Sequence, residues 1–126
     1  MKRSEHTFQF TGLQIAKAAQ AELEYHNMRL NYWGAAQDEA ITAARASGVE
    51  VREHEVTGGK NVQIVIDPTV QSRLNECSAK INTHRASADR FQIEAAAYGT
   101  QPERTYELHP DDVVYFRLAG GPRQNT

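Results

Sequence analysis

The sequence predicts an α+β fold in which two long antiparallel helices form a coiled-coil-like hairpin and two β-hairpins form a small antiparallel sheet, in the order α-β-β-α-β-β. Two observations support this prediction. In residues 70–98, and again in about residues 12–47, apolar side chains recur at alternating spacings of three and four, which places them on one stripe of a helix. Between these segments, Gly58 and Gly59 are flanked by runs rich in valine and isoleucine, which is typical of a β-hairpin.

Length and composition indicate one soluble domain that spans residues 1–126. With 40% hydrophobic and 24% charged residues among 126, the chain is large enough for one core and too small for two. The 14 basic and 16 acidic residues are mixed along the sequence and give a formal net charge of -2. This balance argues against a nucleic-acid partner or an anionic membrane surface. No motif implies a cofactor.

The first residues and the single cysteine favour a cytoplasmic location. No apolar run follows the charged residues near the N-terminus, so we expect neither a signal peptide nor a membrane span. Cys77 has no cysteine in the chain with which to form a disulfide, so nothing indicates an oxidising compartment. It falls on the stripe of the second helix, where a thiol packs as a small hydrophobic group.

The first helix has a clear predicted start and end. Residues 1–7 are expected to be flexible, and Thr11 is the expected N-cap because Gln14, three residues later, completes a capping box. The helix should extend to about residue 47, with Gly48 in the left-handed position that follows many helices. Such a helix has roughly ten turns.

This helix carries two apolar stripes. The first should pair with the second helix and comprises Ala16, Ala19, Leu23, His26, Leu30, Trp33, Gln37, Ala40 and Ala44. The second lies on nearly the opposite side and comprises Ala18, Ala21, Tyr25, Met28, Tyr32 and Ala35. A helix that is apolar on two sides needs a second cover, which either the protein's own sheet or a second copy of the chain can supply. Tyrosine and methionine favour interfaces, so Tyr25, Met28 and Tyr32, with Trp33 beside them, are the candidate interface residues.

The second helix should cover about residues 68–98, with Asp67 as its cap and Pro68 at its first position. Its stripe comprises Val70, Leu74, Cys77, Ile81, His84, Ala88, Phe91, Ala95 and Tyr98. These residues face the first helix, and we expect Leu74 and Ile81 to be fully buried.

Both predicted hairpins follow from turn residues. In the first, about residues 49–66, a turn at Gly58 and Gly59 pairs Val51 near Ile66, and the apolar face comprises Val62, Ile64 and Ile66. In the second, about residues 104–118, Pro110 followed by two aspartates suits a type I turn between strands 105–108 and 113–118. Val114, Phe116 and Leu118 would then face the core, and residues 119–126 would form a flexible tail.

Four groups of residues have some potential for chemistry. His26 and His84 both lie on the helix-pairing stripes and suggest either a metal pair or polar residues that fix register; two histidines do not complete a zinc site, so we assign no metal. Arg73, Arg85 and Arg90 on the second helix suggest either an anion clamp or interhelical ion pairs. The acid/base candidates are the run 52–55 and the set His109, Asp111 and Asp112, which strand-edge and turn chemistry also explain.

The function that the sequence favours is that of a non-enzymatic oligomeric interaction or structural protein, an accessory subunit or adaptor that assembles through its long helices. Its expected partner is a second copy of itself, with another protein as a further option. The alternative is a protein that binds an anionic, nucleotide-like ligand at a subunit interface through Arg73, Arg85 or Arg90 with nearby aromatic residues. A third hypothesis is a small enzyme with acid/base residues in the hairpin loops.

Overall fold

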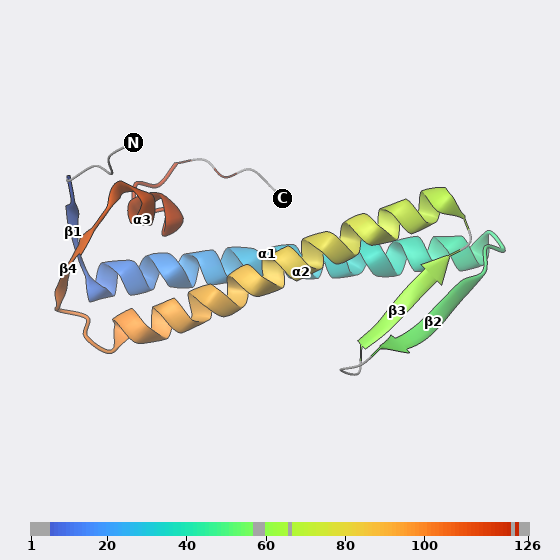
Figure 1. Ribbon diagram of the computed structural model, residues 1–126, viewed down its shortest axis with the longest axis horizontal. Coiled ribbons are helices and arrows are strands. Elements are labelled where there is room, and N and C mark those ends of the chain that lie inside the picture. Colours follow the sequence, from blue (N-terminus) through green and yellow to red (C-terminus); the bar gives the residue numbers. More distant parts are fainter. Residues whose placement is uncertain (1–5, 57–59, 66, 122, 124–126) are drawn as a thin grey trace. The chain divides into compact units, whose positions relative to one another are not determined.

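The computed structural model describes residues 6–56, 60–65, 67–121 and 123. Along these residues the elements are β1 (Phe8–Thr11), α1 (Gly12–Ala46), β2 (Val51–Val56), β3 (Lys60–Val65), α2 (Pro68–Gly99), β4 (Thr105–Leu108) and α3 (Pro110–Tyr115) (Figure 1). The chain divides into two compact units, of which the first comprises Met1–Met28 and Arg85–Thr126 and the second Arg29–His84. Each unit therefore contains one part of α1 and one part of α2.

The predicted ends of α1 are confirmed to within one residue. The Thr11 backbone N donates to Gln14 Oε1 at 2.8 Å and the Gln14 backbone N donates to Thr11 Oγ1 at 3.2 Å, which is the expected capping box. At the other end Gly48 has φ 80, and the Val49 backbone N donates to the Ala44 carbonyl at 2.9 Å. This Schellman-type closure satisfies carbonyl groups that the last turn of a helix leaves without partners.

Helix α2 also begins as predicted, and its stripe points inward. Asp67 Oδ1 accepts hydrogen bonds from the backbone N of Thr69 at 2.9 Å and of Val70 at 3.3 Å. The buried stripe residues are Leu74, Cys77, His84, Ala88 and Phe91. Val70, Ile81, Ala95 and Tyr98 are half-buried, so the expectation of full burial is confirmed for Leu74 and wrong for Ile81.

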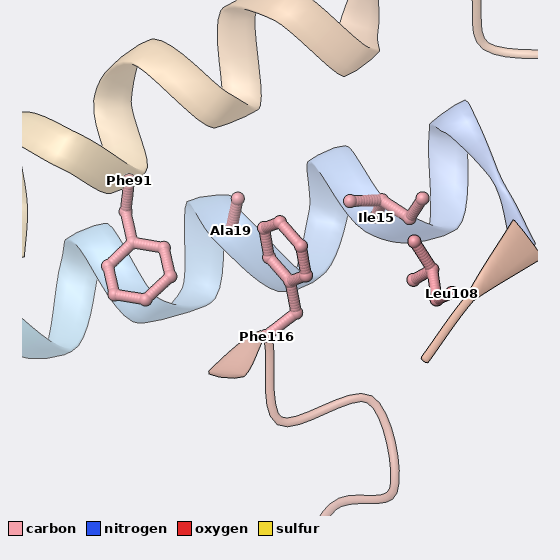
Figure 2. Close-up of a cluster of buried hydrophobic side chains, with 5 residues drawn as sticks. All are labelled: Ile15, Ala19, Phe91, Leu108 and Phe116. Atoms are coloured by element: carbon pink, nitrogen blue, oxygen red, sulfur yellow. The ribbon is translucent and has the colours of Figure 1, made fainter. Parts of the chain in front are cut away.

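The first unit holds a core to which both long helices contribute. Ile15 and Ala19 of α1, Phe91 of α2, Leu108 of β4 and Phe116 just after α3 form one buried cluster (Figure 2). The Phe91 ring stacks on Tyr115, with ring centroids 4.8 Å apart, and meets Phe116 edge-on at 6.4 Å. The amino-terminal part of α1 and the carboxy-terminal part of α2 are thus packed together here.

A short strand, which the sequence analysis did not predict, lies between the residues 1–7 that were expected to be flexible and the start of α1. β1 pairs antiparallel with β4, with Phe8 opposite Leu108 and Thr11 opposite Thr105. The turn after α2 then closes over the start of α1, because the Gly12 backbone N donates to the Arg104 carbonyl at 2.8 Å. A side chain at Gly12 would collide with backbone carbonyl oxygens of this turn, so glycine is required at that position.

The predicted second hairpin is wrong. Residues 110–115 form the helix α3, and the partner of β4 is β1. Pro110 takes the first helical position, and Asp112 Oδ2 accepts from the His109 backbone N at 3.2 Å, so the His-Pro-Asp-Asp sequence starts a helix rather than a turn. Val114 is exposed while Phe116 is buried and Leu118 half-buried, so the three residues do not share one face as the predicted strand required.

In the second unit the predicted first hairpin is confirmed with a shift in register. β2 pairs antiparallel with β3, with Val51 opposite Val65 and Val56 opposite Lys60. The predicted turn at Gly58 and Gly59 lies outside the described residues. The side chains of the expected apolar face, Val62, Ile64 and Ile66, also lie outside what the structure describes. Within the described residues the strands form two separate two-stranded sheets, not the predicted single sheet.

The long helices contact each other in the second unit as well. Gln37 Nε2 of α1 donates to Ser78 Oγ of α2 at 3.3 Å. Trp33 and Ala44 of α1 are buried in this unit, and so are Leu74 and Cys77 of α2. No helix in the described ranges is long and apolar enough to cross a membrane.

Candidate functional site

Several basic side chains surround the carboxylate of Glu22 on α1 in the first unit. Its side chain is 5% exposed. Arg123 binds it with both terminal nitrogens, Nη1 to Oε2 at 2.9 Å and Nη2 to Oε1 at 2.6 Å, and Arg117 Nε lies 3.3 Å from Oε1. A buried carboxylate is stable in such a place only when cations and hydrogen bonds compensate for lost water, and two guanidinium groups supply both here.

The end of α3 positions Arg117 for this contact. The Leu118 backbone N donates to the Val113 carbonyl at 3.0 Å, which closes α3 in a Schellman motif with Arg117 at the left-handed position, φ 55. Glycine is the usual residue there, and a residue with a side chain costs about 1–2 kcal/mol more in this conformation. The Arg117 guanidinium also donates from Nη2 to the Gly121 carbonyl at 2.8 Å and so connects Glu22 to the C-terminal segment.

Two aromatic rings flank the carboxylate. The guanidinium carbon of Arg123 lies 4.1 Å from the ring centroid of Tyr25, which is 8% exposed. His26 stacks on Tyr25, with centroids 5.1 Å apart, and on Phe91 at 5.8 Å. His26 Nε2 lies 3.8 Å from Glu22 Oε2, so an imidazolium there would be within ion-pair distance. We name Glu22, Tyr25, His26, Arg117 and Arg123 the Glu22 cluster.

The sequence analysis did not identify the Glu22 cluster. The two arginines follow Glu22 by about a hundred residues, in a segment whose Gly-Gly-Pro composition is typical of a loop. The sequence did contain one signal that Glu22 is buried. With 100° of rotation per residue, Glu22 lies in the narrower of the two gaps between the apolar stripes of α1. An acidic residue in that position is expected to be buried and to need a cationic partner.

The second apolar stripe of α1 is covered over part of its length. Ala18 packs against the core of the first unit and Tyr25 lies under Arg123. Met28 is 68% and Tyr32 50% exposed, and Ala21 and Ala35 are exposed too. Of the candidate interface residues, the structure therefore places Met28 and Tyr32 at the surface and Tyr25 inside.

Trp33 is buried in the second unit, and two cationic side chains lie near its ring. The Arg73 guanidinium lies 5.4 Å and the Lys80 ammonium 5.9 Å from its ring centroid. Tyr32 meets the Trp33 ring edge-on at 5.2 Å, and Arg29 covers the Tyr32 ring at 4.2 Å. Cations over aromatic faces stabilise such a cluster modestly. Trp33 thus belongs to the packing between α1 and α2 in this unit.

The three candidate ligand-binding arginines do not converge. Arg73 pairs with the Glu76 carboxylate one turn away, and the hydrogen bond to Glu76 raises the pKa of the Arg73 guanidinium. Arg85 and Arg90 are exposed. Along one helix, twelve and seventeen residues correspond to about 18 Å and 26 Å, which exceeds the span of one nucleotide phosphate group. An anion site at a subunit interface that uses one of these arginines stays a prediction.

The other candidate residues that the structure describes cap a helix or lie buried in the packing. His109 and Asp112 cap α3, and Cys77 is fully buried, where desolvation raises the pKa of its thiol and makes it a weak nucleophile. His84 is buried in the second unit. Across the described residues, no group of three or more His, Cys, Asp or Glu side chains is placed to hold a metal ion. The side chains of the 52–55 run lie outside the described part.

Comparison of the chain with protein-family models, with curated proteins and with solved structures finds no match.

Proposed function

We propose that this protein is a non-enzymatic interaction protein that forms a homodimer through the exposed apolar face of α1. One observation carries the proposal. Met28 and Tyr32 stand one turn apart on the same helix and remain 68% and 50% exposed, although the chain covers the adjoining stripe residue Tyr25. Exposed apolar patches rimmed by polar residues mark interaction sites, and tyrosine and methionine are enriched in them.

The spacing of residues on α1 supports a second copy as the partner. In an antiparallel two-fold arrangement centred on Met28, Ala21 of one copy lies opposite Ala35 of the other, since each is seven residues from the centre. Small residues at these positions allow the two helices to approach closely. Lys17 and Glu39, each eleven residues from Met28 and both exposed, also lie opposite each other. The face is thus complementary to itself in size and in charge.

The test is the molar mass in solution of the wild type and of two matched variants. Met28→Glu places a charge at the centre of the proposed interface, and Ile93→Glu places one on α2 at a residue of equal exposure, 70%. Light scattering at micromolar concentration should give twice the 14.1 kDa chain mass for the wild type and for Ile93→Glu, and the chain mass for Met28→Glu. Circular dichroism checks that all three are folded. A monomeric wild type would contradict the proposal.

A further inference from the structure

We propose that Glu22 and Tyr25 form a binding site for a peptide arginine, and that the chain's own Arg123 is an exchangeable occupant of it. In this proposal an arginine-bearing segment presented in trans takes the place of Arg123. The site is distinct from the exposed face around Met28 and Tyr32, and the proposal does not depend on the homodimer.

The two groups match both recognition features of a guanidinium. A carboxylate accepts two parallel N–H bonds from the planar guanidinium, and an aromatic face attracts the delocalised positive charge of the guanidinium. Arg123 makes both contacts at once, with 2.9 and 2.6 Å hydrogen bonds to Glu22 and a 4.1 Å approach to the Tyr25 ring. Lysine offers a compact ammonium without the fork, so the site should select arginine.

Other residues hold the receptor half of the site. Arg117 Nε lies 3.3 Å from Glu22 Oε1 and orients the carboxylate from a backbone position closed by the α3 Schellman motif. The Tyr25 ring stacks on His26, which in turn stacks on Phe91 of the core. Glu22 and Tyr25 are themselves buried on α1. The carboxylate and the ring therefore keep their places when Arg123 is removed, as a binding site requires.

Arg123 itself is held more weakly than the groups that it contacts. Its side chain is 32% exposed, whereas the side chain of Glu22 is 5% exposed. Gly120 and Gly121, with φ 74 and 107, precede it, and glycines add conformational freedom to the unbound segment. An arginine in the same chain competes with an effective concentration of about millimolar. An arginine in trans should thus bind the wild type poorly and an Arg123→Ala chain well.

The experiment measures peptide binding to the full-length Arg123→Ala protein by fluorescence anisotropy. The probe is a labelled peptide with the sequence of residues 119–126, and its matched control carries citrulline, a neutral isostere, in place of arginine. Loss of charge-assisted hydrogen bonds should weaken the citrulline peptide by about ten- to a hundredfold. The wild type should bind the arginine peptide at least about tenfold more weakly than Arg123→Ala, since its own arginine competes.

Two further variants locate the binding on the proposed groups. Glu22→Gln/Arg123→Ala removes the carboxylate charge, and Tyr25→Leu/Arg123→Ala removes the ring; each should lose most of the affinity while circular dichroism shows a folded chain. A scrambled peptide with one arginine distinguishes the source of the ligand. Equal binding supports recognition of arginine itself, and weaker binding supports exchange of this tail between copies. If Arg123→Ala binds no arginine peptide at millimolar concentration, or binds the citrulline peptide equally well, the proposal is overturned and Arg123 is a fixed structural ion pair.

Discussion

Replacing Glu22 with glutamine should destabilise the protein substantially although the two side chains have nearly the same shape. Glutamine keeps one acceptor oxygen but replaces the other with an amide N–H₂. This group is a hydrogen-bond donor and faces guanidinium groups that are also donors, so no hydrogen bond can form between them. Removing one partner from a buried charge pair costs about 3–5 kcal/mol when the remaining charge stays buried. Arg117 and Arg123 are 30% and 32% exposed, so water restores part of their solvation. We therefore expect a loss of about 2–3 kcal/mol in the free energy of unfolding.

Urea unfolding followed by circular dichroism measures this loss, at one protein concentration because self-association would add to the apparent stability. Glu24→Gln is the matched control, since Glu24 lies on the same helix and is exposed; it should change the free energy of unfolding by less than about 0.5 kcal/mol. A double-mutant cycle with Arg123→Ala should give a coupling of about 1 kcal/mol or more. If Glu22→Gln is as stable as Glu24→Gln, the Glu22 cluster does not stabilise the fold and the reasoning is wrong.

Three other predictions concern packing and pH. Leu74→Ala should cost about 2–5 kcal/mol and Ile81→Ala clearly less, because Leu74 is buried and Ile81 half-buried; equal losses in urea unfolding would contradict this. Phe116→Ala should cost about 3–5 kcal/mol and Val114→Ala less than about 0.5 kcal/mol, and a large loss for both variants would favour the predicted strand, in which both residues face the core, over α3. Burial, with Glu94 and Asp112 nearby, raises the pKa of the Tyr98 hydroxyl. A raised folded pKa means that this stability is present below the unfolded value of about 10 and is lost as pH rises through the folded value. The melting temperature should therefore fall less steeply between pH 8 and 11 for Tyr98→Phe than for the wild type. Equal slopes for the two proteins would argue against a raised pKa of Tyr98.

The two long helices and their ends could be predicted because the signals are local. A capping box, a helix-starting Asp-Pro pair and a glycine after the last turn each act within a few residues, and all three are present at Thr11, Asp67 and Gly48. The stripe on α2 could be predicted because a repeat of three and four sets one helix face toward its neighbour. Every residue of that stripe is buried or half-buried.

The elements that were predicted wrongly depend on contacts distant in sequence. The Pro-Asp-Asp sequence suits both a type I turn and a helix start, and only the burial of Phe116 beside exposed Val114 distinguishes them. The pairing of β1 with β4 joins two four-residue strands across the length of the chain, and no turn signal announces it. Such a pairing follows from the core beneath it rather than from local propensity.

The candidate site shows the same division. Met28 and Tyr32 were identified from periodicity on one helix, and both are exposed. The covering of Tyr25 could not be predicted, because it depends on Arg123. Arg123 is held by Glu22, from which it is separated by 101 residues in the sequence. Ionic contacts over such separations follow from the fold that brings the segments together and have no spacing of their own.

The central claim, that two copies meet at the exposed face of α1, is tested most directly by cross-linking at its proposed centre. A cysteine in place of Met28 would lie on the two-fold axis next to its counterpart, within the short Cα separation of about 4.4–6.8 Å that a disulfide needs. Ile93→Cys, equally exposed on α2, is the control, and Cys77 is fully buried in both proteins. On non-reducing electrophoresis after mild oxidation, Met28→Cys should migrate as a dimer while Ile93→Cys remains at the mass of one chain. Cross-linking of Met28→Cys no greater than that of Ile93→Cys would contradict the claim.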